Sequence, residues 1–295
     1  MTAHQLIDSY HNECLVPEQS EKDSIKGQVK RIFNAYKNNT ALGPKELHIA
    51  GSFAKGTMLA GRMEADIELY YPRHNVSFYQ IRDEAIRVAE ACFPKAKISP
   101  SDKCINIEIE KKGTVRSFDI VLGFPVNSPQ QMAEVRNEQQ YIVTTGEFHV
   151  EYVKRQINEW SFYPNIVRLI KDWRNVWDVP LKSIHIELLV ASALHYQKIE
   201  PLNYPECLKS CFKEMMSMCD GTVISPVNWP LDDELYDAPK SDAGINIIDP
   251  ANPSDNMVDY LDSDDVTTIR RQATRAINLI NNEDWRELWQ DEFFD

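Results

Sequence analysis

The sequence predicts an α+β fold, in which a small mixed sheet with helices forms a first lobe and an all-α helical lobe follows it. Two changes in hydrophobic pattern predict this order. Short apolar runs with strand-like alternation fill residues 46–124, and helical periodicity returns from about residue 148. We place the domain division so that residues 1–160 form the first lobe and residues 161–295 the second. A ligand is expected in the cleft between them.

The first lobe opens with a long helix. Its apolar residues keep a helical period from Ile25 to Tyr36, and Asn38-Asn39 ends it. The strands that we expect are 47–50, 66–70, 104–110 and 115–123, and a helix over 79–92 interrupts them.

The second lobe is predicted to be helical throughout, apart from an irregular stretch. The expected helices are 148–159, 164–177, 183–199, 203–219 and 265–290, with residues 220–260 irregular. Cys207, Cys211 and Cys219 share one helix face, and buried reduced thiols are favoured there over a zinc site. Trp285 and Trp289, at helical spacing, are expected to pack the last helix.

The charge distribution bears on the class of ligand. The chain has 295 residues with 32 Lys+Arg and 45 Asp+Glu, a net charge of −13. Residues 231–295 carry 17 acidic and 5 basic side chains (−12), which leaves 28 and 27 (−1) for residues 1–230. A near-neutral body without a basic domain suits a small anionic substrate better than a long nucleic acid.

Features of the N-terminus and of the apolar runs indicate the compartment. Met1 is not followed by a basic and apolar leader, and the apolar runs are far shorter than the ~18–20 residues of a membrane span. We therefore expect a cytoplasmic protein without a membrane partner.

A phosphate-binding turn is predicted at Gly51-Ser52-Phe53-Ala54-Lys55-Gly56-Thr57. A strand that ends in Gly-Ser and turns into a helix leaves backbone N–H groups unpaired. Gly51 allows an anion to approach closely, and the Ser52 hydroxyl adds a donor.

Three acids follow this turn. Asp66 and Glu68 lie two apart on a predicted strand, so both carboxylates face the same side, and Asp119 is a charge inside an apolar strand. Mg²⁺ prefers a few carboxylates together with phosphate oxygens. Each part alone has a plain reading: an ordinary turn, a solvated strand face and a salt-bridged aspartate. Their joint order favours a metal and phosphate site.

This combination resembles the signature of the DNA polymerase β-type nucleotidyltransferases. Residues 244–256 (GINIIDPANPSDN) resemble an aspartate-proline turn of the oligoadenylate synthases, and residues 167–173 and 181–189 resemble the two helices before it. Together with the turn at Gly51, they are similar to the oligoadenylate synthase and cyclic GMP-AMP synthase group. Its bacterial members, the CD-NTase family, make nucleotide second messengers in anti-phage defence.

The resemblance implies a nucleotidyltransferase that joins nucleoside triphosphates into a cyclic or short linear oligonucleotide. It implies two Mg²⁺ ions (Mn²⁺ as a substitute) on Asp66, Glu68 and Asp119, with Asp119 as proton acceptor. Gly51 and Ser52, with Lys171 and Ser183 of the second lobe, would bind the nucleotide.

Partners and alternatives follow from the same resemblance. The expected partners are nucleoside triphosphates and an effector protein that binds the product. A tRNA- or RNA-extending nucleotidyltransferase, a nucleic-acid-gated sensor and a non-catalytic nucleotide-binding protein stay open. So do the bases used, ring closure and the linkage.

Overall fold

The computed structural model describes residues 1–39, 43–72, 77–101, 104–111, 113–125, 132–137, 140–144, 146–197, 202–229 and 241–294. The chain divides into two units of dense internal contacts. We call Pro17–Glu151 the sheet unit, and Met1–Val16 together with Tyr152–Asp295 the helical unit. The domain division at residue 160 stays a prediction.

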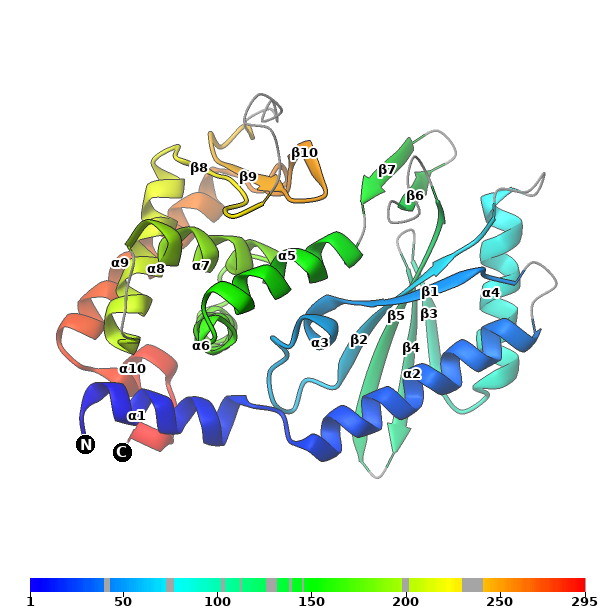
Figure 1. The fold of residues 1–295 in the computed structure, drawn as a ribbon, viewed down its shortest axis with the longest axis horizontal. Helices are drawn as coiled ribbons and strands as arrows, with labels where there is room; N and C mark the ends of the chain where they lie inside the picture. Colours follow the sequence, from blue (N-terminus) through cyan, green and yellow to red (C-terminus); the bar gives the residue numbers. More distant parts are fainter. Residues whose placement is uncertain are drawn as a thin grey trace. The chain divides into compact units, whose positions relative to one another are not determined.

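The sheet unit contains the mixed sheet that the sequence predicts. Its strands run in the order β1 (Glu46–Ala50), β2 (Glu64–Tyr70), β5 (Thr114–Pro125), β4 (Ile105–Lys111) and β3 (Lys97–Pro100) (Figure 1). Strand β2 is parallel to β5, and the other neighbours are antiparallel. Two further strands were not predicted: β6 (Met132–Asn137) pairs with the end of β5, and β7 (Gln140–Thr144) pairs with β6. The helices are α2 (Gln19–Asn39), α3 (Gly51–Lys55) and α4 (Phe78–Cys92).

Period-two alternation divides this sheet into an apolar face and a polar face. The apolar residues of β2, β4 and β5 pack with α2 and α4 in one core. Its central members are Ile25, Val29, Ile32, Tyr36, Ile67, Leu69, Ile81, Ala85, Ile105, Ile107, Phe118 and Ile120. The residues between them in the strands, Asp66 and Asp119 included, therefore point to the opposite face.

The helical unit joins the start of the chain to its second half. It contains α1 (Ala3–Tyr10), a π-helical turn His11–Leu15, most of α5 (Gly146–Glu159), α6 (Tyr163–Val176), α7 (Ser183–Gln197), α8 (Tyr204–Cys219), α9 (Ser263–Asn281) and α10 (Trp285–Trp289) (Figure 1). Helices α8 and α9 pack together, and α7 packs on α6 and α8. In the described part of the chain, no helix has both the length and the apolar character needed to cross a membrane.

Two predictions for this unit were wrong. The helix predicted over 265–290 is interrupted: α9 ends at Asn281, Glu283 has a φ of 55°, and Asp284 starts α10 by accepting a hydrogen bond from the Glu287 N–H at 3.1 Å. The stretch 220–260, predicted as irregular, contains a small sheet of β8 (Val223–Ile224), β9 (Asn246–Asp249) and β10 (Asn252–Asn256).

Asn256 explains how a polar segment forms that sheet. Its side chain is 3% exposed and accepts hydrogen bonds from the backbone N–H groups of Ile247 (3.1 Å) and Val258 (3.2 Å). Its amide donates to the Ile245 carbonyl at 3.1 Å. Side-chain hydrogen bonds thus replace part of the backbone ladder, which a periodicity argument does not detect.

The two ends of the chain lie close together (Figure 1), and aromatic side chains pack between them. The Tyr10 ring lies 5.3 Å from that of Trp289 and 4.7 Å from that of Phe294. Trp285 and Trp289 are both buried, which confirms their predicted packing role. The three cysteines of α8 are likewise free and buried, as predicted.

His185 in α7 is a buried titratable group. Its Nδ1 accepts a hydrogen bond from the Lys182 backbone N–H at 3.2 Å, and its Nε2 is buried without a hydrogen-bond partner among the described residues. Burial, reinforced by the charge of Lys182, lowers the pKa of His185 to about 3. The folded protein therefore holds this imidazole neutral at physiological pH.

We expect the free energy of unfolding to fall as the pH drops below 6.5, because the unfolded chain then takes up a proton that folded His185 excludes until about pH 3. Between pH 6.5 and 5 the loss is about 2 kcal/mol. Urea unfolding of the wild type and of His185→Gln at both pH values measures it. Equal pH dependence in the two proteins would contradict the assignment.

Candidate active site

The centre of the candidate site is a pair of aspartates on neighbouring strands. In the parallel register of β2 and β5, Asp66 lies directly beside Asp119. Burial first, and then the charge of Asp119, raise the pKa of Asp66 to about 6, although the Lys55 ammonium opposes the shift. Two carboxylates repel each other at this partly desolvated position, so a bound cation would stabilise their ionised forms.

The Gly51-Ser52 turn lies against this pair. Gly51 has a φ of +67°, and a Cβ atom added there would lie 1.5 Å from Asp66 Oδ2. Glycine is thus required both for the backbone conformation and for room beside the carboxylate. Ser52 follows in the short helix α3, whose N-cap, Ala50, provides no side-chain hydrogen bond. Backbone N–H groups at the start of α3 therefore have no side-chain cap, as the sequence predicts for a phosphate turn.

Glu68, the third predicted member of the metal site, accepts hydrogen bonds from other residues of the sheet unit. Its Oε1 accepts a hydrogen bond from the Gly146 N–H at 2.7 Å, and its Oε2 accepts one from the Tyr70 hydroxyl at 3.2 Å. The residue is 6% exposed, and burial raises the pKa of the Glu68 carboxyl, although the hydrogen bonds from Gly146 and Tyr70 oppose the shift. Glu68 therefore ties the start of α5 to β2.

The fit around Gly146 supports this role. A Cβ atom at Gly146 would lie 2.4 Å from Glu68 Oε1 and 2.4 Å from the Ala50 side chain. A carboxylate that meets a backbone N–H at the start of a helix also interacts favourably with the helix dipole. Glu68 thus has a structural role, as acceptor for the Gly146 N–H, that its two-residue spacing from Asp66 does not indicate.

Two polar residues near the aspartates were missed by the sequence analysis. Glu64 opens β2, is exposed, and its charge also acts on Asp66. Asn106 on β4 donates a hydrogen bond to Asp119 Oδ1 at 2.7 Å. Glu64 shares the two-residue spacing from Asp66, but the strand was predicted to begin only at Asp66. Asn106 left no signal, because its contact depends on strand pairing.

The donor set fits a divalent cation in part. Among the described residues, no three acidic, histidine or cysteine side chains are gathered closely enough to hold a metal ion. Asp66 and Asp119 nevertheless provide adjacent carboxylates, the oxygen ligands that Mg²⁺ prefers. An exposed third carboxylate, Glu64, lies two residues from Asp66 on the same strand face.

Lys171 and Ser183, the two residues of the helical unit that were predicted to bind the nucleotide, differ in exposure. Lys171 in α6 is 2% exposed, and its Nζ lies 2.7 Å from Glu187 Oε1 of α7. Ser183 is the first residue of α7 and is partly exposed. Removing one partner of a buried ion pair costs about 3–5 kcal/mol, so Lys171 also has a structural role. Nucleotide binding by Lys171 and Ser183 stays a prediction.

Loss of the Glu68 carboxylate is expected to destabilise the sheet unit. In Glu68→Ala the Gly146 N–H and the Tyr70 hydroxyl lose their acceptor, which should lower the free energy of unfolding by about 1–3 kcal/mol. Glu64→Ala, at an exposed position of the same strand, should change it by less than about 0.5 kcal/mol. Urea unfolding measures both, and equal effects would show that Glu68 has no such anchoring role.

Comparisons with known proteins bear on the fold of the whole chain. No protein-family model matches the chain. The curated CBASS oligonucleotide cyclase CdnC of Escherichia coli is 22% identical over 308 residues, which cover 97% of this chain and 95% of the relative. The structure of CdnC from E. coli MS115-1 with ATP has a TM-score of 0.80 at 20% identity and covers 98% of both chains.

A second solved structure shares the fold. The DncV cyclic AMP-GMP synthase of Vibrio cholerae has a TM-score of 0.71 at 14% identity, over 95% of this chain and 90% of its own. The predicted nucleotidyltransferase fold is therefore confirmed. In fold, and over its full length in sequence, the chain is similar to CdnC and DncV, in line with the family that its motifs resemble.

Proposed function

We propose that this protein is a nucleotidyltransferase that joins nucleoside triphosphates into a cyclic or short linear oligonucleotide signal and releases pyrophosphate. The observation that carries the proposal is the Asp66–Asp119 pair beside the Gly51-Ser52 turn. The relatives whose whole length the chain matches are named as oligonucleotide cyclases. As the resemblance of its motifs implies, this protein would act in bacterial anti-phage defence, in the cytoplasm.

In the proposed site, Asp66 and Asp119 hold Mg²⁺, and Mn²⁺ can replace it. The bound ions would supply positive charge to the attacking hydroxyl and to the leaving pyrophosphate. The third ligand was predicted to be Glu68, but both of its oxygens already accept hydrogen bonds. Glu64, exposed and acting electrostatically on Asp66, is the better candidate.

The remaining steps fall to groups of the protein. Asp119 accepts the proton of the attacking ribose hydroxyl, because it is the acid on the strand beside Asp66. The Ser52 hydroxyl and the N–H groups at the start of α3 bind the outer phosphates. Lys171 and Ser183 would contribute from the helical unit.

The partners of the proposed reaction are nucleoside triphosphates and proteins. Related CdnC has been solved with ATP and in a complex with a HORMA protein. By analogy, we infer a protein partner for this chain as well. An effector that binds the oligonucleotide product is also proposed.

The direct test is incubation of the purified protein with four NTPs and Mg²⁺ in the absence of nucleic acid. Mass spectrometry should find a cyclic or short linear oligonucleotide and pyrophosphate. Elongation of added tRNA or RNA as the sole product would instead identify an RNA-extending enzyme. Nucleotide binding without turnover, also with added duplex nucleic acid or a cognate protein partner, would identify a non-catalytic protein.

Asp66→Asn and Asp119→Asn each remove a charge but keep the shape of the side chain. Loss of a residue that only supports a metal ligand lowers activity by about 10- to 100-fold. Because these variants would lose the ligand itself, turnover should fall by more than about 100-fold. Thermal unfolding should show that both variants stay folded. Mg²⁺-dependent turnover near the wild-type rate in either variant would refute the assignment.

Glu64→Gln and Glu68→Gln form a matched pair that identifies the third acid. Glu64→Gln should lower turnover by more than about 10-fold and raise the Mg²⁺ concentration needed for half-maximal rate, as loss of a ligand predicts. Glu68→Gln keeps an acceptor for the Gly146 N–H, so its Mg²⁺ requirement should stay within about 3-fold of the wild type. The opposite result would restore Glu68 as the ligand.

A further inference from the structure

Asn106 occupies a special position relative to Asp119. In the antiparallel register of β4 and β5 the two residues are direct partners, so their side chains lie on the same face of the sheet. Asn106 Nδ2 lies 2.7 Å from Asp119 Oδ1 and 2.7 Å from Ser117 Oγ. Both N–H bonds of the amide therefore have acceptors on β5.

The chemistry of these partners fixes which way the amide points. An ionised carboxylate only accepts hydrogen bonds, so the amide nitrogen must face Asp119. The opposite orientation would place two oxygens in contact. The Asn106 Oδ1 atom is buried without a hydrogen-bond partner in the described part of the chain. The amide is thus held as a donor, although its own acceptor stays unsatisfied.

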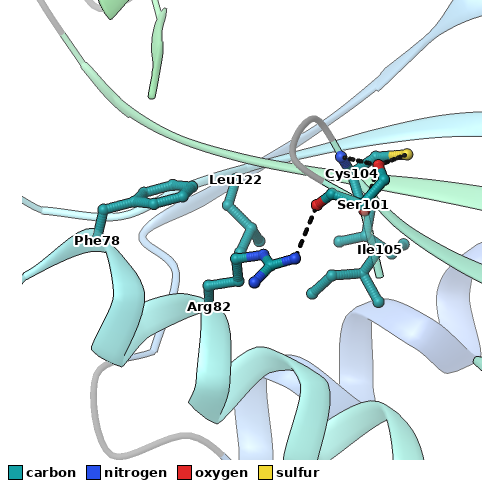
Figure 2. Close-up of a pocket in the computed structure, with 7 residues that line it drawn as sticks. Phe78, Arg82, Ser101, Cys104, Ile105 and Leu122 are labelled. Carbon is teal, nitrogen blue, oxygen red and sulfur yellow. Dashed lines mark hydrogen bonds between the residues drawn. The ribbon is translucent and has the colours of Figure 1, made fainter. Parts of the chain in front are cut away.

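This contact distinguishes the two oxygens of Asp119. Oδ1 accepts the hydrogen bond from Asn106 and lies 3.6 Å from the Cys104 thiol. The backbone N–H of Cys104 in turn donates a hydrogen bond to the Ser101 hydroxyl (Figure 2). Oδ2 makes no hydrogen bond within the residues that the structure describes. Oδ1 of Asp119 is therefore hydrogen-bonded within the sheet, and Oδ2 is available to a cation or a hydroxyl.

We propose that Asn106 is the positioning residue of the active site: it holds Asp119 by Oδ1 and presents Oδ2 to the metal and to the attacking hydroxyl. This inference rests on the proposed nucleotidyltransferase activity. Asn106 acts through Asp119. Residues that orient a metal ligand from behind generally affect metal affinity and rate more than substrate affinity.

Asn106→Ala should therefore lower kcat by about 10- to 100-fold and raise the half-activating Mg²⁺ concentration by a similar factor. The KM for the nucleoside triphosphate at saturating Mg²⁺ should stay within about 3-fold, because the proposed triphosphate contacts are made by the Gly51-Ser52 turn, Lys171 and Ser183, and not by Asn106. A change confined to KM, or no change in the Mg²⁺ requirement, would overturn the proposal.

Asn106→Asp separates a donor role from a packing role. Aspartate has the shape of asparagine but places a carboxylate oxygen where Asn106 Nδ2 lies, against Asp119 Oδ1. If the N–H donor matters, this variant should be at least as impaired as Asn106→Ala, because the two carboxylates repel. Recovery to the wild-type Mg²⁺ requirement would show that Asn106 only fills space. Glu108→Gln is the control, since Glu108 lies on the same strand face and pairs with Lys97 at 3.2 Å.

A binding measurement without turnover separates the two proposals. Electron paramagnetic resonance titration of Mn²⁺ should show weaker binding to Asn106→Ala than to the wild type, with equal thermal midpoints. If the wild type makes no nucleotide product but the Mn²⁺ affinities differ, the proposed function fails and the positioning role holds. If the wild type is active and the variant matches it in rate and Mn²⁺ affinity, the positioning role fails alone.

Discussion

The parallel pairing of β2 with β5 is the constraint on which the candidate site depends. It places Asp66 beside Asp119 in register, with both carboxylates on the face opposite the helices α2 and α4. Such an arrangement is unfavourable by itself, because burial and mutual repulsion both disfavour charge on Asp66. The apolar residues that alternate with the acids stabilise it, since a register shift by one residue would bury the carboxylates and expose Ile67 and Ile120.

Residues on neighbouring elements either leave space for the Asp66–Asp119 pair or donate hydrogen bonds to it. Gly51 leaves the space that Asp66 Oδ2 fills, and Asn106 engages Asp119 Oδ1. Glu68 has the same spacing from Asp66 as Glu64, but its carboxylate accepts a hydrogen bond from the Gly146 N–H. One strand face thus carries a ligand candidate at its exposed start, the central aspartate, and a structural anchor at its buried end.

The resemblance of the motifs and the strand alternation predicted much of this site. Asp66, Asp119, Gly51 and Ser52 were identified from residue type, order and spacing. Glu68 and Glu64 were not separated by these criteria, because both satisfy period two relative to Asp66. Asn106 was missed since a single asparagine between isoleucines gives no local signal. In the fold, β8 to β10 were missed because Asn256 provides hydrogen bonds that hydrophobic periodicity does not report.

By itself the sequence determined the alternation of apolar and acidic residues in β2 and β5, the glycine turn before them, and the helical character of the second half. These features follow from local spacing, which side-chain direction in strands and helices obeys. Only the tertiary structure decided which acid stands beside Asp66, which oxygen of Asp119 is left open, and why Glu68 is engaged by α5. Those outcomes depend on strand register and on contacts between residues distant in the chain, for example the 78 positions that separate Glu68 from Gly146.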